Sequence, residues 1–354
     1  MRALRPGLDG RGSSRSQDRF AGRLATGLAV AVLGALLAGC GAESTPQDAA
    51  KSSGPWSFTN GSGAVVKADK TPERIIAHAG EAAALMSFGI KPVGIYADES
   101  VKTDPNLKDL DLTGITILGE EWGKIDVEKA AGLRPDLIVA DWWPAEKAHS
   151  GLEEGVDEKS KKLAELAPVV GISQGKSIVD LAQGYEDLAK SLGADVTAPA
   201  IAANKQRFQA AVDRFKQAVA AKPGLTVAAM SPYEDLVYVA NPAYAPELLD
   251  FQSWGLKVIN PDSPDPGFPY WENLSWENAD KYQPDLILWD GRAFTPTVNA
   301  EWGKKQPTWF SVKAAKAGAV ASWPAYWMHT FGHFATELDK LTEAIKVADE
   351  NIGD

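Results

Sequence analysis

The sequence predicts an α/β protein with two Rossmann-like lobes joined by a single long, rigid helix. Three observations support this prediction: a helix-and-strand phrase occurs twice, short apolar runs alternate with helical segments in both halves of the chain, and one amphipathic segment lies between the halves. The first copy of the phrase is VEKAAGLRPDLIVADWW at 127–143. The second, WENADKYQPDLILWDGR at 276–292, follows 149 residues later.

Each copy of this phrase predicts a helix that leads into a buried strand. Pro135 and Pro284 end the helices, and the apolar runs at 137–140 and 286–289 are typical of strands covered on both faces of a parallel sheet. Loops at the carboxyl ends of such strands are where open α/β sheets bind ligands, so we expect a ligand cleft between the lobes. We interpret the prolines, together with Asp136 and Asp285, as structural.

Other apolar runs complete the two predicted sheets. They lie at 74–77, 92–96 and 169–172 in the first half of the chain and at 225–230, 237–239, 257–259 and 319–320 in the second.

The segment between the halves predicts one amphipathic helix. Ile201, Phe208 and Phe215 recur at helical spacing among charged residues. Thr197 is expected to cap the helix and Pro199 to occupy its first turn, which gives a rod of roughly 30 Å. The predicted division is therefore an N-terminal lobe at 56–197, an interlobe helix at 198–222 and a C-terminal lobe at 223–354.

The N-terminal segment predicts export. Arginines precede an apolar run at 24–38, and the sequence LAGC ends at Cys40, which resembles a bacterial lipoprotein signal peptide. We expect a signal peptide at 1–39, lipidation of Cys40 and a disordered tether at 40–55. Cys40 is the only cysteine, so the chain can form no intramolecular disulfide.

The net charge and the tryptophan content of the chain indicate which classes of partner suit it. Residues 1–39 carry six arginines and two aspartates, so their removal takes the formal net charge from −11 to −15. Such an acidic surface argues against nucleic acid or an anionic membrane face as a partner. The chain also holds 12 tryptophans, several of them beside Pro and Gly, where a large flat apolar surface suits a large ligand.

The lipobox, the stretch PERIIAHAGEAAALMSFGIKPVGI, the twin PDLI phrases and the single helix between lobes together resemble the class III substrate-binding proteins of ABC importers. That family serves ferric siderophores, haem and cobalamin. The resemblance implies a monomeric, extracytoplasmic receptor, anchored to the membrane by lipid, that captures a ferric siderophore of hydroxamate type and holds no permanent cofactor. Cobalamin and haem remain alternative ligands.

The resemblance also implies a partner, an ABC permease dimer of the FecCD type. Glu128 and Glu277 occupy equivalent places in the two phrases, one helical turn before Pro-Asp. They resemble the acidic pair that docks into arginine pockets on such a permease, where charged contacts steer and orient binding. The alternative is a pair of solvated glutamates.

The predicted ligand contacts are mostly aromatic. Trp122 and Trp271 each lie six residues before one of the repeated glutamates, in loops that we expect to face each other across the cleft. Further candidates lie in loops expected to open toward the same cleft: His78, Trp142, Trp143, Tyr233, Arg292 and Trp327. Arg292 could contact the negatively polarised oxygens of an iron chelate, or it could pair with Asp290. For His78, a structural role is the equal alternative.

A metal site and an enzyme are both weaker interpretations. His329 and His333 have the spacing of one helical face, but no glutamate follows the first histidine as in HExxH, so we predict no metal site. Paired acids and an aromatic cleft would also suit a secreted glycoside hydrolase. However, neither an opposed pair of carboxylates nor a G-x-S-x-G motif is evident, so we predict no enzymatic activity.

Overall fold

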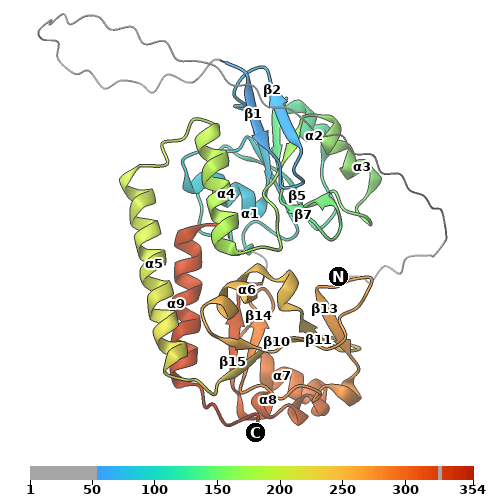
Figure 1. Cartoon of the computed structure of the whole chain (residues 1–354). Coiled ribbons are helices and arrows are strands. Elements are labelled where there is room, and N and C mark those ends of the chain that lie inside the picture. Colours follow the sequence, from blue (N-terminus) through green and yellow to red (C-terminus); the bar gives the residue numbers. More distant parts are fainter. Residues whose placement is uncertain (1–53, 326–328) are drawn as a thin grey trace, which may run out of the picture. The chain divides into compact units, whose positions relative to one another are not determined.

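The computed structural model describes residues 54–325 and 329–354 (Figure 1). The predicted signal peptide at 1–39, Cys40, most of the tether and Trp327 lie outside these residues. Among the helices that the structure describes, none is both long and apolar enough to cross a membrane.

The N-terminal half forms a parallel sheet in the order β5-β4-β3-β6-β9. Its strands are β3 (Ile75–His78), β4 (Gly94–Ala97), β5 (Thr116–Glu120), β6 (Leu137–Val139) and β9 (Val169–Val170). The helical segments of this half are α1 (Ala79–Ser87), α2 (Val127–Gly132), α3 (Glu158–Lys161), η1 (Lys162–Glu165) and α4 (Ile178–Ser191). Two antiparallel hairpins accompany the sheet, namely β1 (Trp56–Thr59) with β2 (Val65–Ala68), and β7 (Trp142–Trp143) with β8 (Ala148–His149).

The C-terminal half forms a mixed sheet in the order β13-β11-β10-β14-β15, with β12 also paired to β10. Its strands are β10 (Thr226–Pro232), β11 (Val237–Ala240), β12 (Lys257–Val258), β13 (Trp271–Leu274), β14 (Leu286–Asp290) and β15 (Val320–Trp323). The pairings of β11 are antiparallel, and the others are parallel. The helical segments are η2 (Pro242–Tyr244), α6 (Pro246–Ser253), η3 (Trp276–Asn278), α7 (Val298–Lys305), η4 (Pro307–Ser311), α8 (Lys313–Ala317) and α9 (Phe331–Val347). The predicted α/β class is confirmed.

The long helix between the two sheets, α5, runs over Pro199–Ala220, with its apolar face buried as the periodicity predicts. The prediction of its cap was wrong, because the N-cap is Ala198 and the Thr197 hydroxyl instead donates to Asp195. Helix α9 lies beside α5 (Figure 1), so the long helix packs against a second helix. Phe208 of α5 and Phe334 of α9 have ring centroids 5.1 Å apart and belong to a hydrophobic core that also includes strand residues of both sheets.

The two repeated phrases differ in their helices. The first forms α2, but the second forms only the short 3₁₀ helix η3, so the prediction of two equal helices was wrong. Asn278 and Asp280 stand where the first phrase has Lys129 and Ala131, and both changes lower the helix propensity. The strands that follow, β6 and β14, are fully buried as predicted.

The repeated aspartates have matching structural roles, as predicted. Asp136 accepts the backbone N–H groups of Glu73 and Arg74, just before β3. Asp285 accepts the backbone N–H of Thr226 at the start of β10. In both sheets, this aspartate therefore fixes the start of its own strand beside the start of the neighbouring parallel strand.

Candidate functional site

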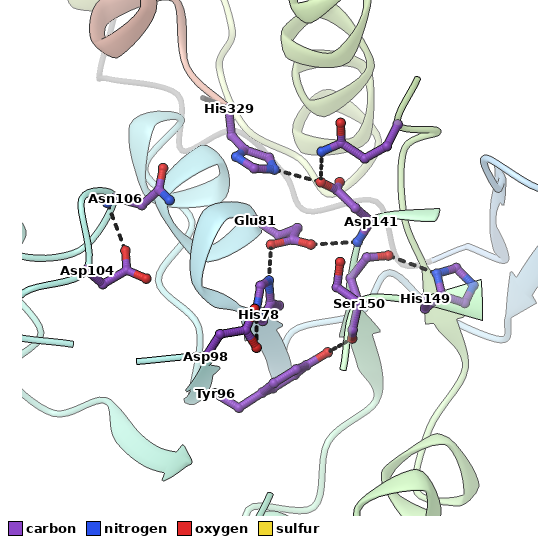
Figure 2. A network of polar contacts seen from close by, with 12 residues as sticks. His78, Glu81, Tyr96, Asp98, Asp104, Asn106, Asp141, His149, Ser150 and His329 are labelled. Atoms are coloured by element: carbon purple, nitrogen blue, oxygen red, sulfur yellow. Dashed lines mark hydrogen bonds and ion pairs between the residues drawn. The ribbon is translucent and has the colours of Figure 1, made fainter. Parts of the chain in front are cut away.

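A buried polar network lies at the carboxyl ends of the parallel strands of the first sheet (Figure 2). Glu81, in the first turn of α1, lies between two partners: its Oε1 accepts the backbone N–H of Asp141 at 2.6 Å, and its Oε2 lies 3.0 Å from Nδ1 of His78. His78 ends β3, and its Nε2 lies 3.4 Å from Asp98, which follows β4. The network thus joins the ends of three neighbouring strands.

The same network receives a residue from the distant end of the chain. Nε2 of His329 lies 2.6 Å from Oδ2 of Asp141, and both side chains are at most 5% exposed. The hydroxyl of Tyr185 and the amide of Gln174 also donate to Asp141. His329 follows the last strand of the second sheet, so this contact connects the two halves of the chain.

Gly80 makes room for this histidine. A Cβ at position 80 would lie only 2.4 Å from Cε1 of His329, closer than real contacts allow. The absence of a side chain at Gly80 therefore lets the imidazole lie directly on the first turn of α1.

The electrostatics of the network follow from burial and close pairing. Burial by itself lowers the pKa of His78, but the carboxylates of Glu81 and Asp98 outweigh this and hold the pKa well above its usual value. Burial raises the pKa of Glu81, yet the charge and hydrogen bond of His78 lower it overall. Burial and the charge of Glu81 raise the pKa of Asp141. His78 and Glu81 therefore form an ion pair at neutral pH.

Glu81, Asp141 and His329 could in principle hold a metal ion, since each offers one ligand atom and these atoms lie within 4.8 Å of one another. The hydrogen bonds already described account for their arrangement without an ion, because the oxygens of both carboxylates accept N–H or O–H groups. The predicted common helical face of His329 and His333 was wrong. His329 precedes α9, whereas His333 lies in its first turn and is 3.7 Å from Glu337.

The predicted pair of facing tryptophan loops was wrong for one member. Trp122 is 46% exposed in the turn after β5, but Trp271 is the first residue of β13 and is 7% exposed. Its ring lies against those of Tyr238 and Trp323, with centroids 5.6 and 6.0 Å away. Local pattern does not reveal this strand, because its residues follow a Pro-rich segment and do not alternate between polar and apolar.

Arg292 forms the alternative contact that the sequence left open. Its Nε and Nη2 donate to the two carboxylate oxygens of Asp290 at 3.0 and 2.6 Å. Glu99 lies in the loop after β4. Burial and the charge of Asp104 raise the pKa of its carboxyl group, and the charge of Arg292 lowers this pKa by a smaller amount.

The remaining candidates have mixed environments. Trp142 and Trp143 form β7 and are half-buried, and Tyr233, after β10, is 45% exposed. Trp143 touches Tyr270 of the other half of the chain, with ring centroids 6.0 Å apart. The two halves thus meet here at two places, where His329 contacts Asp141 after β6 and where Trp143 of β7 contacts Tyr270 just before β13.

Sequence reasoning missed the roles of Glu81, Asp141 and His329. One signal was present, since Asp141 is the final aspartate of the first phrase and corresponds to Asp290 in the second. Asp141 follows the buried strand of its phrase and Asp290 is the last residue of its strand, yet Asp141 pairs with a distant histidine and Asp290 with an arginine two residues away.

Comparison with known proteins adds to this geometry. A family model described as "Periplasmic binding protein" matches residues 87–327. The structure of DesE, a ferric-siderophore receptor protein from Streptomyces coelicolor, is similar with a TM-score of 0.74 and 36% sequence identity, over 83% of this chain and 99% of that one. A search of curated proteins gave no match.

Two more distant structures share the fold. The siderophore periplasmic binding protein from the fuscachelin gene cluster of Thermobifida fusca has a TM-score of 0.53 and 22% identity, over 78% of this chain and 96% of that one. FhuD2 from Staphylococcus aureus, solved with bound ferrioxamine B, has a TM-score of 0.53 and 20% identity, over 77% and 98% of the two chains.

Proposed function

Because the chain belongs to the periplasmic binding protein family, whose members are extracytoplasmic binding proteins and not enzymes, we propose that it captures a ferric siderophore and delivers it to an ABC permease. The observation that carries this proposal is the 36% identity, over 83% of this chain, with the ferric-siderophore receptor DesE. The siderophore is a transported ligand, and no cofactor is held permanently.

The proposed ligand site lies where the strands of both sheets end. We assign to it the exposed rings of Trp122 and Tyr233, the half-buried Trp142 and Trp143, and Trp327, which lies outside the described residues. Arg292 and His78 border this region and are already paired with carboxylates. Trp271 has a packing role there, since neighbouring rings cover it.

The proposed partner is a permease dimer of the FecCD type, reached through Glu128 and Glu277. Both side chains are exposed, and each lies in the first turn of a short helix that precedes a PDLI strand. This equivalence supports two similar contacts, one from each lobe. The proposed lobes cover 56–197 and 223–354, with the interlobe helix at 198–222 between them.

The proposed anchor is a lipid on Cys40, after cleavage of a signal peptide at 1–39, and it rests on the sequence alone. Cys40→Ala should move the protein from the membrane fraction to the soluble fraction of cells. Retention in the membrane fraction would contradict lipidation at this residue.

A titration tests the binding function directly. Tryptophan fluorescence of the purified protein should be quenched in a stoichiometric, saturable manner by a ferric hydroxamate. The panel should also include a ferric catecholate, haem and cobalamin, and mass spectrometry should find each ligand unaltered after incubation. Binding of haem or cobalamin alone would contradict the siderophore assignment, and a converted product would contradict the binding role.

A further inference from the structure

The turn that carries Tyr233 is held in place by two other segments of the C-terminal half. This turn joins β10 to β11, and the backbone N–H of Tyr233 donates to the carbonyl of Leu236 at 2.7 Å, which closes it. Tyr233 itself is 45% exposed at the carboxyl end of β10 and is a proposed ligand contact. We call residues 233–236 the ligand turn.

Three side chains contact Glu234 in this turn. The indole N–H of Trp276, in η3, donates to the backbone carbonyl of Glu234 at 3.1 Å. The amide of Gln306, just after α7, donates to the same carbonyl at 3.4 Å, and Nζ of Lys305 lies 3.2 Å from the Glu234 carboxylate. Surface ion pairs contribute little, and both charges of this pair are more than half exposed, so the hydrogen bonds to the carbonyl are the stronger restraint.

A stack of two tryptophans fixes the position of Trp276. Its ring lies nearly parallel to that of Trp302 in α7, with centroids 5.8 Å apart and an angle of 23° between the planes. Nζ of Lys305 lies 4.7 Å from the centroid of the Trp302 ring, where the ring face attracts a cation. Both tryptophans are half-buried and pack against the hydrophobic core of this half. The stack therefore sets the direction in which the indole N–H of Trp276 points.

The same tryptophan lies next to the proposed permease contact of this half. Glu277 follows Trp276 in η3, and its side chain is exposed. In the first phrase, Val127 stands in the corresponding place before Glu128, and valine has no side-chain donor. A connection from a docking glutamate to a ligand contact by way of an indole N–H is therefore a feature of the second phrase.

We propose that Trp276 is a positioning residue, which holds the ligand turn and Glu277 as one rigid unit. Tyr233 then meets the chelate in a preformed orientation, and such a contact favours affinity because less conformational freedom is lost on binding. Disturbance of Trp276 should consequently affect both ligand affinity and delivery to the permease, whereas loss of the Tyr233 ring should affect affinity alone. This proposal rests on the proposed siderophore function and adds a residue that acts through Tyr233 and Glu277.

Calorimetric titration of the purified full chain with ferrioxamine B tests the effect on affinity. Trp276→Phe keeps a ring against Trp302 but removes the donor to Glu234. Trp302→Phe is the matched control, because it removes an indole from the same stack and keeps that hydrogen bond. Trp276→Phe should weaken binding about three- to tenfold, the range of one hydrogen bond, and Trp302→Phe by less than about twofold.

A double-mutant cycle shows whether this effect passes through Tyr233. In a Tyr233→Ala background, Trp276→Phe should cause no further loss of affinity, because the contact that it positions is then absent. A merely structural role of Trp276 would lower affinity equally in both backgrounds. Melting curves check that each variant is folded.

Uptake of radiolabelled ferrioxamine B by cells that carry only one variant tests the effect on delivery. Tyr233→Ala should raise the concentration for half-maximal uptake without changing the maximal rate, and Glu277→Lys should lower the maximal rate alone. Trp276→Phe should change both quantities. Immunoblots of the membrane fraction check that each variant is present in equal amount.

The outcomes distinguish this inference from the proposed function. If the wild type did not bind ferrioxamine B, the proposed function would fail and the role of Trp276 with it. If the wild type bound but Trp276→Phe had normal affinity, or lost as much as Trp302→Phe, the positioning of Tyr233 would be overturned and the siderophore function would stand. A full loss in the Tyr233→Ala background would overturn it as well. A normal maximal rate of uptake in Trp276→Phe would overturn the connection to Glu277.

Discussion

The buried contact of Asp141 with His329 allows a quantitative prediction about stability. The two carboxylate oxygens of Asp141 have three partners, namely His329, Tyr185 and Gln174. Asp141→Asn keeps the shape of the side chain but replaces one of these oxygens by an NH2 group, which is a donor and cannot accept a hydrogen bond. At least one donor must then face another donor in a buried environment. Breaking a buried pair in this manner costs about 3–5 kcal/mol.

This cost converts into a change in melting temperature. A folded body of roughly 300 residues has an unfolding entropy of about 0.6 kcal/mol/K, so the melting temperature should fall by about 5–8 °C. Differential scanning calorimetry at neutral pH measures it. Asp290→Asn is the matched control, because it alters the corresponding aspartate of the second phrase, whose partner Arg292 is 34% exposed and better served by water. A shift within about 1 °C of the wild type, or no larger than that of Asp290→Asn, would refute the reasoning.

Three further predictions concern pH, ligand and partner. Because the pKa of His78 is raised in the folded state, the protonated imidazole stabilises the fold fully below about pH 6.5 and progressively less as pH rises through the folded-state pKa. His78→Asn should therefore flatten the alkaline limb of a plot of unfolding free energy against pH. An unchanged limb would argue against the pairing of His78 with Glu81 and Asp98. Trp122→Ala should weaken binding of a ferric hydroxamate by about 1–3 kcal/mol in a fluorescence titration without lowering the melting temperature, and unchanged affinity would remove Trp122 from the site. Glu128→Lys with Glu277→Lys should leave ligand affinity and melting temperature unchanged but reduce siderophore-dependent growth, whereas Glu154→Lys should not; normal growth of the double variant would show that the pair does not dock.

Local patterns predicted much of the fold. The spacing of Ile201, Phe208 and Phe215 identified α5, and the apolar run after each Pro-Asp identified β6 and β14. Each depends on residues close together in sequence, where helical or strand periodicity is visible. The antiparallel strand β13 and the packing of α9 along α5 depend on distant pairings, which periodicity cannot reveal.

The candidate site was harder to predict for the same reason. Asp141 and His329 are 188 residues apart, and nothing in the spacing of either residue indicates the other. Loop position suggested that Trp271 was exposed like Trp122, but exposure depends on which rings cover a residue, and Tyr238 and Trp323 cover Trp271.

The repeated phrase has two parts with different consequences. Its Pro-Asp pair has the same structural role in both sheets, because Asp136 and Asp285 each accept backbone N–H groups at the start of the neighbouring parallel strand. The last aspartates of the two phrases have different partners. Asp290 pairs with Arg292, two residues away, whereas Asp141 contacts His329 from the other half of the chain. A similar helix-and-strand unit therefore builds both halves, and the contact of Asp141 with His329 between them arises only at the end of the first copy. Exchange of Asp141 should consequently affect the relation between the halves, while exchange of Asp290 should affect only its own loop.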